Sequence, residues 1–343
     1  GGSEGLVYDG RLAFEVHDVD LGALPEVETR ILMNIASPSA ALAWWRLPVR
    51  GVGLARMEYL VNEVIQVHPM ALAHFDAVDD VEERERIEEL TRRYEDKTEY
   101  FVDKLAQGIA LMAAAQHPNP VVVRTSDFKT NEYADLLGGS AFEPHEENPM
   151  LGWRGASRYY DEGYEDGFAL ECRALRRVRS EMGFRNVVVM IPFCRTPEEA
   201  DRVLAVMAKH GLERGKDGLE IWVMAEIPSN ILEAERFAER FDGFSIGSND
   251  LTQLTLGVSR DEERLKGLFD ERSPSVKWMI RTLAEKAHRA GRKVSLCGQA
   301  PSDHPEMARF LVEAGLDSIS VNPDSVVRVI EQVAQAEGAR SRG

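Results

Sequence analysis

The sequence predicts an α/β protein with the (β/α)₈ barrel fold and a helical insertion. Short, continuous apolar runs alternate with helical segments along most of the chain, which is typical of parallel strands covered on both faces. A length of 343 residues suits one barrel with insertions as well as it suits two domains. A doubly wound open sheet is the alternative, but no glycine-rich dinucleotide fingerprint follows an early strand.

Nine strand-like runs compete for the eight places of such a barrel, so one of them must lie outside it. The piece from Gly152 to Arg154 and the last run are the candidates. The runs cover residues 30–36, 51–56, 121–125, 151–155, 187–192, 220–226, 243–246, 293–299 and 318–321. We expect the barrel to span residues 29–337, and residues 1–28 to be a linker or the end of a preceding domain.

Helix signals fill the intervals between these runs. Ser37-Pro38 and Thr196-Pro197 are typical helix starts, because a hydroxyl caps the helix and proline fits its first turn. Further helices are expected over 275–290 and 305–314. Residues 77–116 are expected to be helical, and the charge-rich part from 81 to 104 to form a solvated surface without chemistry. The helix over 165–182 carries Arg173, Arg176, Arg177 and Arg179, expected on a wet amphipathic face.

The amino-acid composition limits the partners and the cellular location that we expect for this protein. The formal net charge of −17 disfavours nucleic acid and anionic membranes as partners, and no apolar run of about 18 residues predicts a membrane span. The N-terminal residues do not resemble a signal peptide. Three scattered cysteines favour a reducing, cytoplasmic setting over a disulfide framework or a zinc site. We therefore expect a cytoplasmic protein, and an anionic ligand would need a local group of arginines.

Polar side chains of complementary chemistry follow the predicted strands. In a (β/α)₈ barrel these strand ends converge on the face that carries the active site. Arginine forks suit phosphate and carboxylate groups, although each arginine could instead form a structural ion pair. The residues in question are Arg56, Arg124, Arg154, Glu226, Asn249, Asp250 and Cys297.

Glu226 and Asp250 end two successive strands, so their carboxylates should lie side by side. Neighbouring carboxylates repel each other unless a proton or a cation lies between them, and Mg²⁺ held by both and by substrate oxygens fits this arrangement. A carboxylate paired with an arginine is the alternative. Asn249 and the backbone of Gly247 and Ser248 would hold an anion, or the same stretch could simply cap a helix.

Cysteines in apolar runs usually fill the core, and we assign that role to Cys172 and Cys194. The position of Cys297 at a strand end instead makes it a candidate proton donor or acceptor. Arg260 lies downstream of this region and could fold back toward the site.

Several motifs, in order along residues 5–335, resemble the phosphoenolpyruvate-utilising enzymes. They are GVGLARME at 51–58, NPMLGWRG at 148–155, GFSIGSNDLTQ at 243–253 and LCGQ at 296–299. VRTSDFKTNEY at 123–133 and the run over 146–155 resemble the phosphoenolpyruvate synthase (pyruvate, water dikinase) branch in particular.

The resemblance implies a C-terminal phosphoenolpyruvate/pyruvate-binding barrel that carries phosphoryl transfer from a phosphohistidine to pyruvate enolate. The overall reaction of that branch converts ATP, pyruvate and water to AMP, phosphoenolpyruvate and phosphate. It implies that Arg56, Arg124 and Arg154 bind the substrate, and that Glu226 and Asp250 hold Mg²⁺. By the same resemblance Asn249 binds substrate and Cys297 handles the proton at the methyl carbon. Ser248 departs slightly from the pattern, since relatives often have threonine there.

The resemblance also implies a homodimer and two N-terminal domains, one binding ATP and one carrying the phosphohistidine, that this chain lacks. None of the eight histidines has the setting of a phosphorylation site; His68 is expected in a loop and His304 beside a helix cap. Two other functions stay open: a Mg²⁺-dependent carbon–carbon lyase that uses pyruvate enolate on the same barrel, and a module that senses phosphoenolpyruvate without chemistry.

Overall fold

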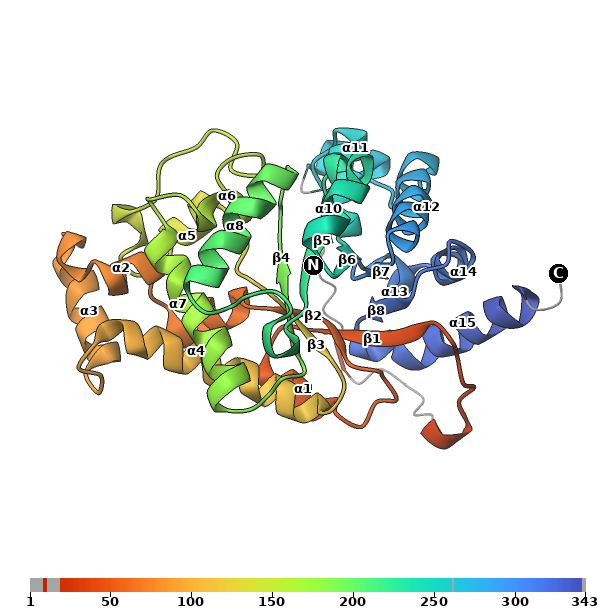
Figure 1. The fold of residues 1–343 in the computed structure, drawn as a ribbon, viewed down its shortest axis with the longest axis horizontal. Helices are drawn as coiled ribbons and strands as arrows, with labels where there is room; N and C mark the ends of the chain where they lie inside the picture. Colours follow the sequence, from red (N-terminus) through yellow and green to blue (C-terminus); the bar gives the residue numbers. More distant parts are fainter. Residues whose placement is uncertain (1–8, 11–18, 261, 341–343) are drawn as a thin grey trace.

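Eight parallel strands close into a barrel in chain order, which confirms the predicted fold (Figure 1). The computed structural model describes residues 9–10, 19–260 and 262–340. The last strand closes the barrel by pairing with the first, with Arg30 opposite Ser318. The strands are β1 Arg30–Ile35, β2 Val52–Arg56, β3 Val121–Arg124, β4 Val187–Ile191, β5 Ile221–Ala225, β6 Gly243–Ile246, β7 Lys293–Leu296 and β8 Ser318–Val321.

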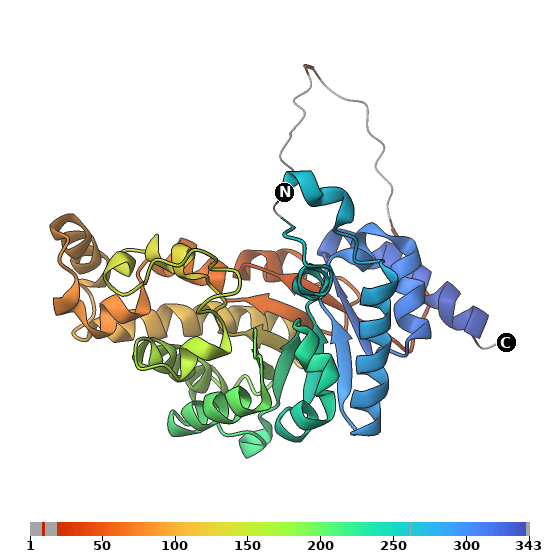
Figure 2. The same cartoon turned by 90° about the horizontal axis from the view of Figure 1, so that it is seen from above.

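Helices follow every strand and cover the outside of the barrel (Figures 1 and 2). Ser37 and Thr196 accept hydrogen bonds from Ala40 N and Glu199 N and cap α1 and α8, as predicted. The helices are α1 Pro38–Ala43, α2 Pro69–Ala73, α3 Val81–Thr91, α4 Lys97–Gln116, α5 Thr130–Ala134, α6 Ala156–Tyr159, α7 Glu165–Arg176, α8 Pro197–Lys209, α9 Pro228–Leu232, α10 Ala234–Arg240, α11 Ser248–Leu256, α12 Pro274–Arg289, α13 Ala300–Asp303, α14 Pro305–Glu313 and α15 Val326–Arg340.

Apolar side chains fill two compartments. The larger one lies between the strands and the surrounding helices and is rich in valine, leucine, isoleucine and phenylalanine. The smaller one forms a separate cluster of strand and strand-end residues that includes Met190, Trp222 and Cys297. Because all five residues of β4 and of β5 are buried, these strands read as continuous apolar runs in the sequence.

The insertion consists of extra helices after β2 and β3, and it extends the molecule to one side (Figure 1). The expectation of a solvated surface over residues 81–104 holds for most of α3 but is wrong for the start of α4. Tyr100, Phe101 and Val102 are buried, because α4 packs against α1, α2 and α7. The charged stretch over residues 81–104 thus ends within α4, a helix that is packed in the core.

The arginine-rich helix also differs from the prediction. Regular α7 ends at Arg176 and a π-helical turn continues over Arg177–Glu181. Arg179 is buried rather than wet, and its guanidinium donates to the carbonyl oxygens of Arg185, Val187 and Asp217. A buried arginine of this kind satisfies loop carbonyls that would otherwise lack donors.

The structure identifies the extra strand-like piece. Residues Gly152 to Arg154 lie in a turn outside the barrel, whereas the run over 318–321 is β8. His68 lies in the short connection before α2, as expected for a loop residue, but it is fully buried and caps that helix; His304 stands at the start of α14, as expected. In the described part of the chain, no helix is long and apolar enough to cross a membrane.

Most of the predicted linker, residues 1–28, lies outside the described residues. Where the described chain approaches the barrel, the backbone amides of Glu28 and Thr29 donate to the carboxylate of Glu337 in α15. The first strand is therefore tied to the last helix at the point where the barrel begins.

Candidate active site

The predicted site residues meet at the C-terminal ends of the strands. Arg56 and Arg124 are register partners at the ends of β2 and β3. Glu226 directly follows β5, and Cys297 directly follows β7. Ser248, Asn249 and Asp250 form the first turn of α11, which begins one residue after β6. Arg154 lies in a turn of the insertion, so the expectation that it ends a strand is wrong.

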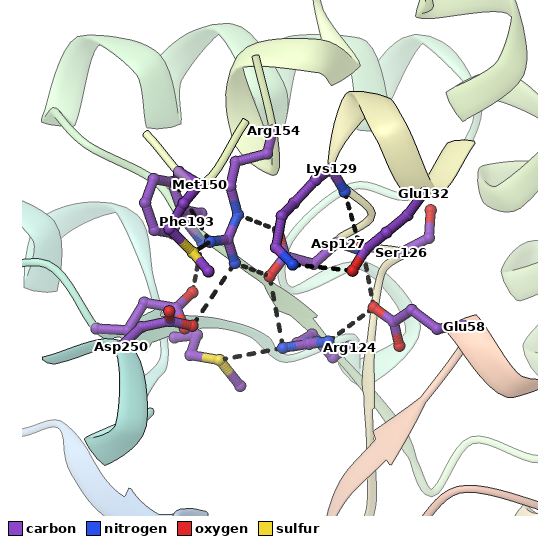
Figure 3. Close-up of polar contacts among 12 residues, drawn as sticks. Glu58, Arg124, Ser126, Asp127, Lys129, Glu132, Met150, Arg154, Phe193 and Asp250 are labelled. Atoms are coloured by element: carbon purple, nitrogen blue, oxygen red, sulfur yellow. Dashed lines mark hydrogen bonds and ion pairs between the residues drawn. The ribbon is translucent and has the colours of Figure 1, made fainter. Parts of the chain in front are cut away.

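Asp127 joins two of the arginines (Figure 3). Its carboxylate accepts from Arg154 Nε at 3.1 Å and from Arg154 Nη2 at 2.6 Å, which is the bidentate geometry of a strong ion pair. The same carboxylate lies 3.6 Å from Arg124 Nη1. Burial would raise the pKa of Asp127, but Arg154 and Arg124 hold it below its usual range. Asp127 is therefore an anion that fixes both guanidinium groups.

Glu58 holds the other side of Arg124. Its Oε1 accepts from Arg124 Nη2 at 2.7 Å and from the backbone amide of Asp127 at 2.8 Å. Burial works against the charge of Arg124, but Glu58, Asp127 and Glu226 outweigh it and raise the pKa of the guanidinium. Arg124 Nε is buried and has no partner among the described residues. A donor with no protein acceptor, beside a fixed charge, is suited to an anionic ligand.

Arg154 reaches the site from the insertion. Its guanidinium lies 3.6 Å from Asp250 Oδ2 and 4.0 Å above the ring of Phe193, and only 3% of the residue is exposed. The adjacent Gly155 has φ of +60°, and a Cβ there would lie 2.5 Å from Phe193 Cβ. Glycine is thus required where the chain turns sharply against the end of β4.

A fully buried ionic cluster anchors this insertion. Arg158 binds the carboxylate of Glu143 through both terminal nitrogens and donates to Trp153 O at 3.2 Å. His68 Nε2 lies 3.0 Å from the same carboxylate, while its Nδ1 accepts from Met70 N. Burial lowers the pKa of His68, so the ring is neutral with its proton on Nε2. The cluster fixes the backbone one residue before Arg154.

The two predicted metal ligands lie at the same place. Glu226 is 1% exposed, and its Oε1 accepts from Phe193 N at 2.8 Å. Gly247 packs against it, since a Cβ on Gly247 would lie 2.9 Å from Glu226 Oε2. Burial, followed by the charges of Asp250 and Asp127, raises the pKa of Glu226 well above its usual range. A proton or a cation would relieve this repulsion.

These carboxylates fit a hard cation that retains substrate and water ligands. Mg²⁺ commonly binds through one or two carboxylates together with substrate oxygens. Among the described residues, no group of three or more histidine, cysteine, aspartate or glutamate side chains is arranged to hold a metal. Glu226 and Asp250 would therefore supply only some of the ligands of a bound cation, and the other coordination positions would be open to a substrate.

Cys297 lies beside Ile246 at the mouth of the barrel. Its Sγ lies 3.5 Å from Ile246 O, and burial raises its pKa to about 11. Glu226 raises this pKa further, while Arg124 and Arg56 lower it. The resting side chain is thus a neutral thiol that can donate a proton, and the two arginines favour the thiolate that remains. Cys172 and Cys194 are buried, in agreement with a structural role.

The remaining predicted site residues lie around the arginines, carboxylates and cysteine described above. Arg56 stands at the end of β2, where desolvation and the charge of Arg124 lower the pKa of its guanidinium. Arg260 lies in the turn after α11, and its backbone amide donates to Gln253 Oε1. The hydroxyl of Ser248 donates to Glu271, and Gly298 lies so close that a Cβ would overlap Ser248 Oγ. Asn249 is partly exposed in the first turn of α11, which begins after Gly247 and not at an Asn-Asp cap.

Sequence reasoning missed Asp127, Glu58 and Phe193 as parts of the site. Asp127 and Glu58 lie close behind Arg124 and Arg56 in the chain, and that spacing could have indicated them. No signal in the sequence marks Phe193, because its contacts are to residues distant in the chain.

A comparison with known protein families shows which family this chain belongs to. The family model described as "PEP-utilising enzyme, PEP-binding domain" matches residues 15–338. The chain belongs to this family. Its matched range covers the whole barrel and all of the residues discussed above.

Several curated relatives of this PEP-binding domain are named phosphoenolpyruvate synthase. Phosphoenolpyruvate synthase from Synechocystis is 58% identical over 98% of the chain, and the enzyme of that name from Aquifex aeolicus is 49% identical over 98%. Phosphoenolpyruvate synthase from Escherichia coli is 47% identical over 97% of the chain. The chain spans only 41%, 44% and 42% of these proteins, respectively, so it corresponds to one part of longer enzymes.

Proposed function

We propose that this PEP-binding domain carries the pyruvate half-reaction of a phosphoenolpyruvate synthase. In this reaction a phosphohistidine on another domain transfers its phosphoryl group to the enolate oxygen of pyruvate. The complete enzyme would convert ATP, pyruvate and water to AMP, phosphoenolpyruvate and phosphate. The observation that carries the proposal is the group of arginines, paired carboxylates and one thiol at the mouth of the barrel.

Each group has a role that suits its chemistry. Arg56 and Arg124 stand side by side at the ends of β2 and β3, where they can neutralise the phosphoryl group during transfer. Arg154 adds a third guanidinium near Asp250. The first backbone amides of α11, together with Asn249, are placed to hold the carboxylate of the substrate, because helix N-termini bind anions. Arg260 stands close enough to contribute charge.

Glu226 and Asp250 are the residues that would hold Mg²⁺. When bound, the ion would neutralise oxygens of the phosphoryl and carboxylate groups. Burial and neighbouring carboxylates raise the pKa of Glu226, and a cation held there would stabilise its ionised form.

Cys297 would exchange the proton at the methyl carbon. In synthesis its thiolate removes a proton from pyruvate, and the enolate oxygen then forms the bond to phosphorus as the phosphorus–nitrogen bond of phosphohistidine breaks. In the reverse direction the thiol returns the proton to the enolate carbon. The neighbouring Arg56 and Arg124 stabilise the thiolate form.

The chain covers only part of the length of its relatives, and the parts that it does not cover indicate which other domains would act with it. We propose that the ATP-binding and phosphohistidine functions reside in the parts of the longer enzyme that precede this domain. A homodimer and a cytoplasmic location belong to the same proposal. Trp44 and Trp45, exposed after α1 by 42% and 55%, provide an apolar surface for a second copy.

The test is exchange of the pyruvate methyl protons, followed by proton NMR in D₂O with Mg²⁺ present. The wild-type chain is expected to exchange them, and Cys297→Ala to slow the exchange by roughly 100-fold or more, the usual effect of a general acid–base group. Cys172→Ala removes a buried thiol elsewhere and serves as the control. Unchanged exchange in Cys297→Ala would remove Cys297 from the reaction, binding without any exchange in the wild type would favour the sensor alternative, and release of pyruvate from hydroxy acids would favour the lyase.

A further inference from the structure

Phe193 has an unusual backbone conformation beside the site. It follows β4 and Pro192 and has φ of +48°, in the left-handed region that residues with a Cβ rarely adopt. Only 3% of the residue is exposed. Such a conformation persists only where the surroundings determine it, and non-glycine residues of this kind gather at functional sites.

Two contacts of Phe193 reach different parts of the site. Its backbone amide donates to Glu226 Oε1 at 2.8 Å, so it holds a side chain instead of continuing the hydrogen bonds of the sheet. Its ring lies 4.0 Å below the guanidinium of Arg154, on the side away from Asp127's hydrogen bonds (Figure 3). One residue thus contacts a predicted metal ligand and a predicted substrate ligand.

Neighbouring groups fix the ring in this place. The guanidinium of Arg195 lies 4.8 Å from the same ring, and it also donates to Gly152 O and Arg154 O in the turn that carries Arg154. Gly155 touches Phe193 so closely that any side chain there would collide with it. The turn, the ring and the end of β4 therefore form one packed unit.

We propose that Phe193 is a positioning residue that aligns Arg154 with Glu226 for the binding of magnesium and phosphoenolpyruvate. Arg154 stands on an insertion outside the barrel, and Glu226 on a barrel strand end, so their relative placement needs a link. Phe193 provides it through a cation–π contact on one side and a backbone hydrogen bond on the other. The inference rests on the proposed function of the site.

The first test titrates phosphoenolpyruvate with Mg²⁺ into three variants by calorimetry. Phe193→Leu keeps the backbone amide and loses the ring, and its affinity is expected to fall about tenfold, the size of a desolvated cation–π contact. Phe193→Tyr keeps the ring and should stay within about twofold of the wild type. Phe237→Leu changes a buried phenylalanine of α10 and should lower the melting temperature without changing affinity. Wild-type affinity in Phe193→Leu would overturn the inference.

A second measurement needs no ligand, so it separates this inference from the proposed function. The Nε–H proton of Arg154 lies near the ring of Phe193 and bonds to Asp127, so its NMR signal should show a ring-current shift. The signal is expected to move in Phe193→Leu and to remain in Phe193→Tyr. If the wild-type chain binds no phosphoenolpyruvate, the proposed function fails, and this signal still tests the contact between Phe193 and Arg154 on which the positioning depends. An unmoved signal in Phe193→Leu would overturn it.

Discussion

Asp127 shows how single residues set the electrostatics of the site. It neutralises Arg154 through two hydrogen bonds and approaches Arg124, so two guanidinium groups share one buried anion. Glu58 also pairs with Arg124, so carboxylates hold both guanidinium groups in place in a chain whose net charge is −17. An anionic substrate would therefore meet arginines whose positions are already fixed.

Glu171 gives a pH prediction at the same scale. It is buried in α7 and accepts from the amide of Ser126 at 3.0 Å and from the Ser126 hydroxyl, directly beside Asp127. Burial raises the pKa of Glu171 to about 7, while the hydrogen bonds from Ser126 oppose that rise. A carboxyl whose pKa is higher in the folded state binds its proton more tightly there. Its contribution to stability is therefore present below the unfolded pKa of about 4.3 and is lost as the pH rises to about 7.

Glu171→Gln removes this titration. The free energy of unfolding of the wild type should fall relative to that of the variant by roughly 2–3 kcal/mol between pH 5 and pH 8. Urea unfolding at a series of pH values measures the difference. Glu181→Gln, at the exposed end of the same helical segment, is the control and should follow the wild type. Parallel curves for Glu171→Gln and the wild type would show that Glu171 titrates normally.

At the scale of elements, the insertion is held to the barrel by charges without access to solvent. His68, Glu143 and Arg158 are contributed by α2, by the loop after α5, and by α6. The ring planes of Tyr133, Trp153 and Tyr164 pack around Arg158 at 4.0–4.7 Å. Removing one partner of such a cluster leaves a buried charge without compensation.

Arg158→Met should therefore lower the free energy of unfolding by about 3–5 kcal/mol, the usual cost of breaking a buried ion pair. Denaturant unfolding measures it. Arg309→Met is the matched control, because Arg309 pairs with Glu313 on the exposed surface of α14 and should change stability little. A loss no larger than that of the control would mean that the cluster does not anchor the insertion.

The sequence predicts the strand-end residues well, because strand ends can be located from apolar runs and all eight ends of a barrel meet on one face. Glu226, Asp250 and Cys297 could be placed together by this argument alone. Arg154 could not, because its turn is positioned by Arg158, Glu143 and Arg195 through contacts far apart in sequence. The buried Arg179 escaped prediction for the same reason: periodicity does not show that it donates to the carbonyl oxygens of Arg185, Val187 and Asp217.

At the scale of the whole molecule, the closed barrel brings the strand ends that carry the site residues together within this chain. All eight strands are present and the last pairs with the first, so the strand ends that carry the site residues are fixed relative to one another. We therefore expect the domain to bind substrate by itself, whereas the proposed ATP-dependent reaction would need the rest of the longer enzyme. Autonomous, metal-dependent binding of substrate is thus what the proposed site predicts for this chain.

Calorimetric titration of the chain with phosphoenolpyruvate, with and without Mg²⁺, tests this claim most directly. Saturable binding that depends on Mg²⁺ is predicted for the wild type, and Asp250→Asn should lose the dependence on the metal because one of the two proposed carboxylate ligands is gone. Absence of binding in both conditions would contradict the account, since the arginines and carboxylates at the mouth would then not form a substrate site in this chain.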